Sequence, residues 1–120
     1  NHDDLRKRTK DFAIRIIHLA GSLPSGRCGD VLGRQLLRSG TSIGANYREA
    51  LRASSKRHFT TTIEIAAREA DETLYWLDLL AESSIVSRPR LVKLVQECEK
   101  LLAILAATAR SAKRRADQRK

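Results

Sequence analysis

The sequence predicts an all-α protein, an antiparallel up-down four-helix bundle that we expect to oligomerise. Three observations predict this fold: apolar residues recur at intervals of three and four, Gly and Pro are scarce, and those few gather in short stretches. The 120 residues include six Gly and two Pro. Apolar residues at such intervals form one stripe along a helix, which must pack against other helices to leave water. The length suits one domain, so we expect a single bundle over residues 1–120.

The first helix is expected to begin near Asp3 and Asp4, because apolar residues follow these two at helical spacing. Its stripe consists of Leu5, Phe12, Ile16, Leu19 and Leu23. Residues 21–29 then hold three Gly and one Pro, a composition that regular elements tolerate poorly, so this stretch is the predicted first loop. The carboxylate of Asp30, directly after the loop, suits the N-cap of the next helix.

The second helix is expected over about residues 31–53. Its predicted inner side consists of Leu32, Leu36, Ser39, Ile43, Asn46, Tyr47 and Ala50. Gly40 and Gly44 stand one turn apart among other small residues, at a helix-propensity cost of about 1 kcal/mol each. This composition predicts unusually close packing of a neighbouring helix.

The third helix is expected to start after Ser54 or Ser55, whose hydroxyls can cap it, and to run to about residue 83. Its predicted inward stripe consists of Phe59, Ile63, Ala66, Ala70, Leu74, Leu77 and Ala81. Residues 84–88 form the second predicted loop. Pro89 fits the first turn of a fourth helix capped by Ser87. The seam of that helix consists of Leu91, Leu94, Cys98, Leu101 and Leu105, spaced as in a coiled coil.

A basic tail closes the sequence, since residues 110–120 carry six basic residues and one acid. Two interpretations stay open for it. The tail frays and reaches for a partner, or it ends the fourth helix as a solvated turn whose cations suit the helix dipole.

The charge balance favours a polyanionic partner. The formal net charge is +9, which suits nucleic acid or, failing that, an acidic protein or an anionic membrane surface. No apolar run approaches the roughly 20 residues that span a bilayer, and no secretory signal pattern stands at the start. We therefore expect a cytoplasmic protein without a membrane partner.

The sequence lacks the residue patterns of catalysis and metal binding. Cys28 and Cys98 lie far apart in different environments, which predicts neither a disulfide framework nor a metal site. None of the three histidines, His2, His18 and His58, follows a glutamate by three residues, as di-metal bundles require. No zinc-protease, phosphate-loop or Cys-x-x-Cys motif occurs. We expect no enzyme, no catalytic residue and no cofactor.

One polar constellation stands out, because Ser42, Asn46 and Glu49 share one side of the second helix. In a functional interpretation Glu49 is a base or a ligand. In a structural interpretation Asn46 and Glu49 bond to a neighbouring helix or subunit and fix its register, and we favour this one.

Two segments carry a family resemblance. Residues 35–50, QLLRSGTSIGANYREA, and residues 65–80, IAAREADETLYWLDLL, resemble the signature blocks of a bacterial four-helix bundle family. This family was first noticed in proteins encoded by intervening sequences of large-subunit ribosomal RNA. The matching positions are Ser39, Ser42, Ile43, Ala45, Asn46, Glu49, Phe59, Ile65, Ala66, Glu69 and Leu80. The resemblance extends over nearly the whole chain.

The resemblance implies a homopentameric barrel of bundles. It also implies kinship with the accessory variability proteins of diversity-generating retroelements, which bind nucleic acid and assist a reverse transcriptase. No catalytic residues come with the family. Where many members have Gly and Arg, this chain has Ala50 and Ala53, a departure that resembles the branch whose third helix reads like EADETLYWL and that concerns the partner more than the fold.

A subunit interface is predicted on the third helix. Ile65, Trp76 and Leu79 fall about 100 to 160° from its inward stripe, too far round to share that core. A Trp left outside a core favours burial by a partner, although scattered exposed apolar residues are also common.

A basic stripe is predicted on the second helix. It consists of Arg34, Arg38, Arg48 and Arg52, within about 40° of one line opposite the core. Lys56 and Arg57 extend it into the first turn of the third helix, where the dipole disfavours cations. These residues are the predicted nucleic-acid-binding site. The alternative is neutralisation within or between bundles by an acidic face, Glu64, Asp71, Asp78 and Glu82.

Three functions therefore compete. The first is an oligomeric nucleic-acid-binding accessory protein, which acts on RNA or DNA and assists a reverse transcriptase or acts on structured RNA. The second is a protein-interaction scaffold without nucleic-acid binding. The third, an enzyme, has no constellation of residues to support it.

Overall fold

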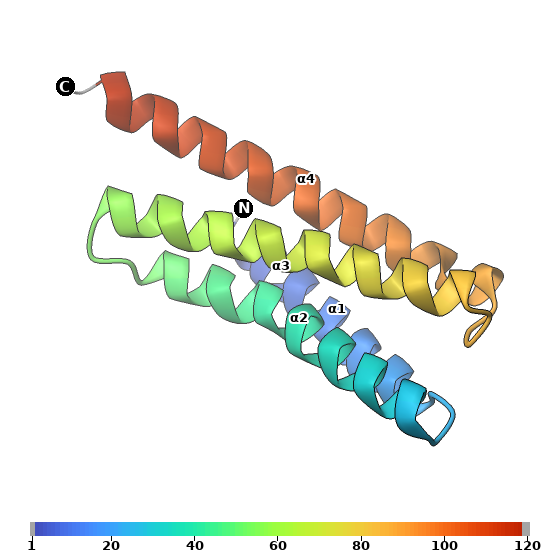
Figure 1. Ribbon diagram of the computed structural model, residues 1–120. Helices are drawn as coiled ribbons and strands as arrows, with labels where there is room; N and C mark the ends of the chain where they lie inside the picture. The colour runs from blue at the N-terminus through green and yellow to red at the C-terminus, as the bar shows by residue number, and fades with distance from the viewer. Residues whose placement is uncertain (1, 119–120) are drawn as a thin grey trace.

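The computed structural model describes residues 2–118 and consists of four helices: α1 (His2–Gly21), α2 (Arg27–Leu51), α3 (Lys56–Glu82) and α4 (Arg88–Gln118). No strand occurs among the described residues. The chain runs up and down, so the α2–α3 connection and the C-terminal end of α4 lie at one end of the molecule (Figure 1). The α1–α2 and α3–α4 connections lie at the other end (Figure 1). The predicted antiparallel bundle is confirmed.

The start of α2 corrects the sequence prediction. The helix begins one turn before the expected position, and the N-cap is Gly26, not Asp30. Gly26 has a φ of 131°, which side-chain-bearing residues rarely adopt, and its carbonyl oxygen accepts a hydrogen bond from the Asp30 amide at 2.9 Å. Asp30 instead lies in the first turn, where the helix dipole favours its carboxylate.

The starts of the other two helices agree with the sequence. The hydroxyl of Ser55 caps α3 by accepting a hydrogen bond from the His58 amide at 3.0 Å. The fourth helix begins directly after Ser87 and holds Pro89 in its first turn. The basic tail continues α4 as regular helix up to Gln118, and positions 119 and 120 lie outside the described residues.

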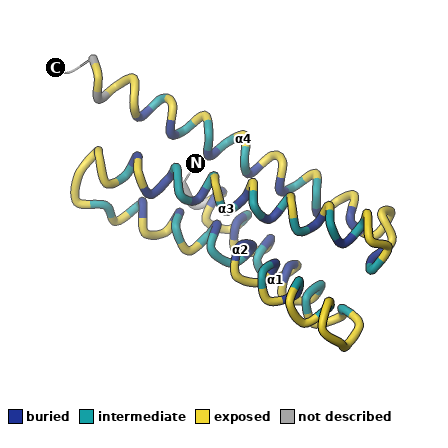
Figure 2. The backbone as a smooth tube through the Cα atoms, viewed as in Figure 1, coloured by how far each residue is buried: buried dark blue, intermediate teal, exposed yellow. Residues whose placement is uncertain are grey.

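The core is aliphatic and follows the predicted stripes. Figure 2 shows buried positions along the sides of the helices that face one another. All five seam residues of α4 are buried. Among them Cys98 donates its thiol hydrogen to the Ala70 carbonyl oxygen, 3.3 Å from the sulfur, and burial raises the pKa of this thiol to about 12. Cys98 is therefore a protonated packing residue, whereas Cys28 is exposed.

A buried polar contact between α2 and α3 was missed in the sequence. Ser39 and Thr73 are both fully buried, and the Thr73 hydroxyl lies 2.8 Å from that of Ser39. Thr73 also donates to the Glu69 carbonyl oxygen at 2.7 Å. The hydroxyls thus satisfy one another where the two helices meet.

The small residues of α2 allow α1 to approach closely, as predicted. A Cβ atom on Gly40 would stand 2.8 Å from two side-chain carbons of Ile16. A Cβ atom on Gly44 would stand 3.0 Å from the hydroxyl oxygen of Thr9. A bidentate ion pair joins α1 to α4. Two Arg8 nitrogens lie 2.9 and 3.1 Å from the carboxylate oxygens of Glu97.

Candidate nucleic-acid interface

The predicted stripe on α2 separates into two parts in the structure. Arg34, Arg48 and Arg52 are exposed, and no ion pair joins them to a side chain within the described part of the chain. Arg38 leans toward α3 instead, 3.3 Å from a carboxylate oxygen of Glu69 and in an ion pair with Glu72. Arg38 is therefore held by a neighbouring helix, which the other three arginines are not.

The acidic face of α3 is largely engaged by α4 and not by the basic stripe. Glu64 lies 3.0 Å from the ammonium of Lys113. Arg88 lies 3.6 Å from Asp78 and 3.5 Å from Glu82. Among the described contacts, carboxylates of α3 therefore neutralise only Arg38 of the basic stripe. These carboxylates are not the ones that were predicted to do so.

The first turn of α3 brings further cations to the same end of the molecule. Lys56 and Arg57 are exposed, and this turn contains no acid. The imidazole Nε2 of His58 lies 3.6 Å from a carboxylate oxygen of Glu49 on α2. Cations at a helix N-terminus are disfavoured by about 0.3 to 1 kcal/mol each. Local helix stability therefore does not explain their presence.

Cations from all four helices meet at this end, which we call the basic end. The up-and-down topology places the end of α2, the start of α3 and the end of α4 there (Figure 1). The start of α1 lies beside the end of α2, because Arg6 and Lys10 line one groove with Arg48. Its exposed basic residues are Arg6, Lys7, Lys10, Arg48, Arg52, Lys56, Arg57, Arg110, Lys113, Arg114 and Arg115. The predicted site covered α2 and the first turn of α3; it lacked the cations of α1, and those of α4 were predicted only as a basic tail.

The polar constellation on α2 forms local bonds. The hydroxyl of Ser42 donates to the Arg38 carbonyl oxygen at 2.6 Å, and the amide of Asn46 donates to the Ser42 carbonyl oxygen at 2.8 Å. Both bonds stay within α2, whereas we expected Asn46 to bond to another helix or subunit. Only Glu49 reaches α3, through His58.

The three predicted interface residues share one face of α3 at helical spacing, and all are half-buried. Trp76 corrects one premise, because its indole packs against the core. Its Nε1 also donates to the Glu72 carboxylate at 3.0 Å. The adjacent Tyr75 is 56% exposed and meets the indole edge to face, with ring centroids 5.2 Å apart. The interface role of Ile65, Trp76 and Leu79 stays a prediction.

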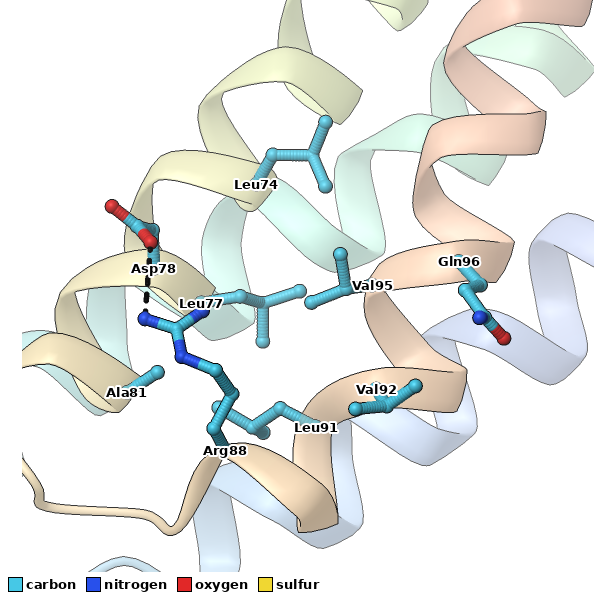
Figure 3. A pocket seen from close by; sticks show the side chains of 9 residues that line it. All are labelled: Leu74, Leu77, Asp78, Ala81, Arg88, Leu91, Val92, Val95 and Gln96. Atoms are coloured by element: carbon cyan, nitrogen blue, oxygen red, sulfur yellow. Dashed lines mark ion pairs between the residues drawn. The ribbon is translucent and has the colours of Figure 1, made fainter.

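A small apolar pocket of about 200 Å³ lies between α3 and α4 at the opposite end of the bundle. Figure 3 shows Leu77, Leu91 and Val95 pointing into it and the Arg88–Asp78 ion pair at its edge. Apart from Gln96, its other lining residues are aliphatic, so it suits an apolar side chain and offers no acid–base pair.

Two comparisons with known proteins agree with this fold, and a third finds nothing. A family model described as 23S rRNA-intervening sequence protein matches residues 2–107. The solved structure of a protein with unknown function from the S23 ribosomal protein family of Bacteroides thetaiotaomicron VPI-5482 is similar. It shares 34% sequence identity with a TM-score of 0.85, and the match covers 91% of this chain and 97% of that chain. No curated protein matches the chain.

The described residues show neither a membrane span nor a metal cluster. None of the described helices combines the length and the apolar character that crossing a bilayer requires. Among the same residues, no three His, Cys, Asp or Glu side chains gather in a way that could hold a metal ion.

Proposed function

The chain belongs to the 23S rRNA-intervening sequence protein family, and from that premise we propose that it is a non-catalytic, oligomeric protein that binds nucleic acid, with structured RNA as the first candidate. The proposal extends to an accessory role, like the support that the accessory variability proteins give to a reverse transcriptase. The basic end is the observation that carries the proposal. It supplies the electrostatic footprint that nucleic-acid-binding proteins share.

The charges at the basic end favour the binding of a polyanion over ion pairing within the bundle. Lys10, Arg48, Arg52, Lys56 and Arg57 form no ion pair with any side chain that the structure describes. Like charges gathered at one end repel one another and disfavour the folded state, unless a ligand neutralises them. The phosphates of a nucleic acid do so with release of counterions, which makes binding sequence-tolerant and strongly dependent on salt.

We expect measurable binding by the unaltered protein. Filter binding or gel shift with a structured RNA and with duplex DNA, each at about 50 and 200 mM salt, should show affinity that falls by at least tenfold at the higher concentration, since the release of counterions from several phosphates becomes less favourable. Absence of binding to both ligands at the lower concentration would overturn the proposed function.

Oligomerisation would multiply the basic end, and the family resemblance implies five copies. We expect light scattering at micromolar concentration to report a mass several times that of one chain. Leu79→Glu, which introduces a charge into the predicted interface, should lower that mass. Ala103→Glu, at an exposed position of α4, should not. A monomeric parent protein would refute the interface prediction.

A protein-interaction scaffold is the second candidate function. The apolar pocket between α3 and α4 favours it, because Val92 at its edge is 44% exposed and could receive a partner side chain. Oligomers that bind neither RNA nor DNA would put this candidate first.

A further inference from the structure

A groove of about 660 Å³ runs between α1 and α2 on the outer surface of the bundle. The groove is lined by five small residues, Thr9, Ala13, Thr41, Gly44 and Ala45. Basic side chains line it toward the basic end, and they are Arg6, Lys7 and Lys10 from α1 and Arg48 from α2. The groove thus combines small residues with cations from two helices.

The closeness of the two helices explains why these cations converge. Gly44 has no Cβ atom, and one placed there would already crowd Thr9 of α1, 3.0 Å from its hydroxyl oxygen. The Thr9 and Thr41 hydroxyls donate to carbonyl oxygens of their own helices, at 3.1 Å to Arg6 and 2.7 Å to Leu37. These two hydroxyls are therefore engaged, and charge recognition falls to the longer basic side chains.

Lys10 and Arg48 supply charge that no described acid neutralises. Neither forms an ion pair with a side chain that the structure describes. Lys7 differs, because Asp11 lies 2.7 Å from its ammonium, and the hydrogen bond to that carboxylate raises the pKa of Lys7. The groove therefore has at least two cations, one on each helix, for an anionic ligand.

Exposed apolar residues continue the faces of α1 and α2 that line the groove. On α1, Lys10, Ala13, Ile14 and Ile17 share one face at helical spacing. On α2, Leu37 stands one turn from Thr41 on the face that carries the groove. Ile14, Ile17 and Leu37 are 41, 47 and 39% exposed. This arrangement suits a ligand that has both negative charges and apolar groups.

We propose that this groove binds one unpaired strand of nucleic acid, with phosphates at Lys10 and Arg48 and bases against Ile14, Ile17 and Leu37. The proposal rests on the proposed function and adds the ligand class. A duplex hides its base faces and presents phosphate and groove edges, so it would use the cations alone. An unpaired strand exposes its bases, and apolar contact with them is tolerant of sequence.

The test fills the groove without changing its charge. In Ala13→Leu/Ala45→Leu, two bulky side chains replace small ones that line the groove. The matched control is Ala103→Leu/Ala107→Leu, two exposed positions of α4. Leu propagates a helix nearly as well as Ala, so circular dichroism should show both variants folded. Fluorescence anisotropy then measures binding of a 12-nucleotide oligouridine and of a 12-base-pair RNA duplex.

We expect the groove-filling variant to bind the oligouridine at least fivefold more weakly than the control, while duplex affinity changes less than twofold. Equal oligouridine affinity in the two variants overturns the groove proposal, and so does an equal loss for the strand and the duplex. A changed oligomeric mass with unaltered strand binding would also overturn it, because the face would then join copies of the chain. Parent protein that binds neither ligand refutes the proposed function itself.

Discussion

Replacing Gly40 by Leu is expected to lower the free energy of unfolding by about 2 to 3 kcal/mol, because α1 leaves no room for a side chain there. Even a Cβ atom would stand 2.8 Å from two carbons of Ile16, which is fully buried and branched at Cβ. The helices must separate to admit the leucine. At about 4 °C per kcal/mol the midpoint of thermal unfolding should fall by about 10 °C.

The matched control is Gly21→Leu at the end of α1, where no atom lies within 4 Å of an added Cβ. It should change stability by less than about 0.5 kcal/mol. The double variant Ile16→Ala/Gly40→Leu should lose less stability than the two single losses combined, since the truncation makes room for the leucine. Thermal unfolding is compared at one chain concentration, because oligomers unfold in a concentration-dependent way. Additive losses would contradict the close packing.

The sequence predicts the helices well because their signals are local. Periodic apolar residues locate all four helices, and the Ser55 cap is read from the residue type itself. The α1–α2 connection is predicted less well. Asp30 has the better N-cap side chain, but Gly26 provides the left-handed backbone that starts the helix earlier. The N-cap preference of a residue type does not reveal whether Gly26 or Asp30 forms the cap, because the backbone geometry of the loop decides it.

The candidate site is predicted only in part, because the angular positions of residues on α2 do not reveal which helix packs on each side of it. Arg38 and Arg48 both lie within about 40° of the outer line of α2, on opposite sides of it. The structure places α3 carboxylates beside Arg38 and the basic start of α1 beside Arg48. The same angular offset therefore gives an internal ion pair in one case and a shared cationic groove in the other.

Charge reversal at the basic end is the second large effect that we expect. Arg48→Glu/Arg52→Glu should weaken binding of RNA or DNA at least tenfold, because two phosphate contacts become repulsions. Each lost contact should also make the slope of log affinity against log salt shallower by about 0.9. The two arginines are exposed, so helicity and oligomeric state should stay unchanged.

Two further variants separate a local contact from a general loss of positive charge. Arg27→Glu/Arg90→Glu carries the same charge change at the starts of α2 and α4, at the far end of the bundle. It should weaken binding less than threefold, because screened charges act over about 10 Å at 0.1 M salt. Arg48→Gln/Arg52→Gln removes the charges without reversing them and should give an intermediate loss.

The pattern across these variants locates the bound phosphates along the basic end. If Arg48 and Arg52 contact them, the loss follows the order Glu pair, Gln pair, far-end pair, and the salt slope decreases only for the first two. Unaltered binding in the Glu pair would move the site to the end of α4, where Arg110, Arg114 and Arg115 are exposed. Equal losses in the near and far Glu pairs would mean that net charge alone governs binding and that the structure builds no local site.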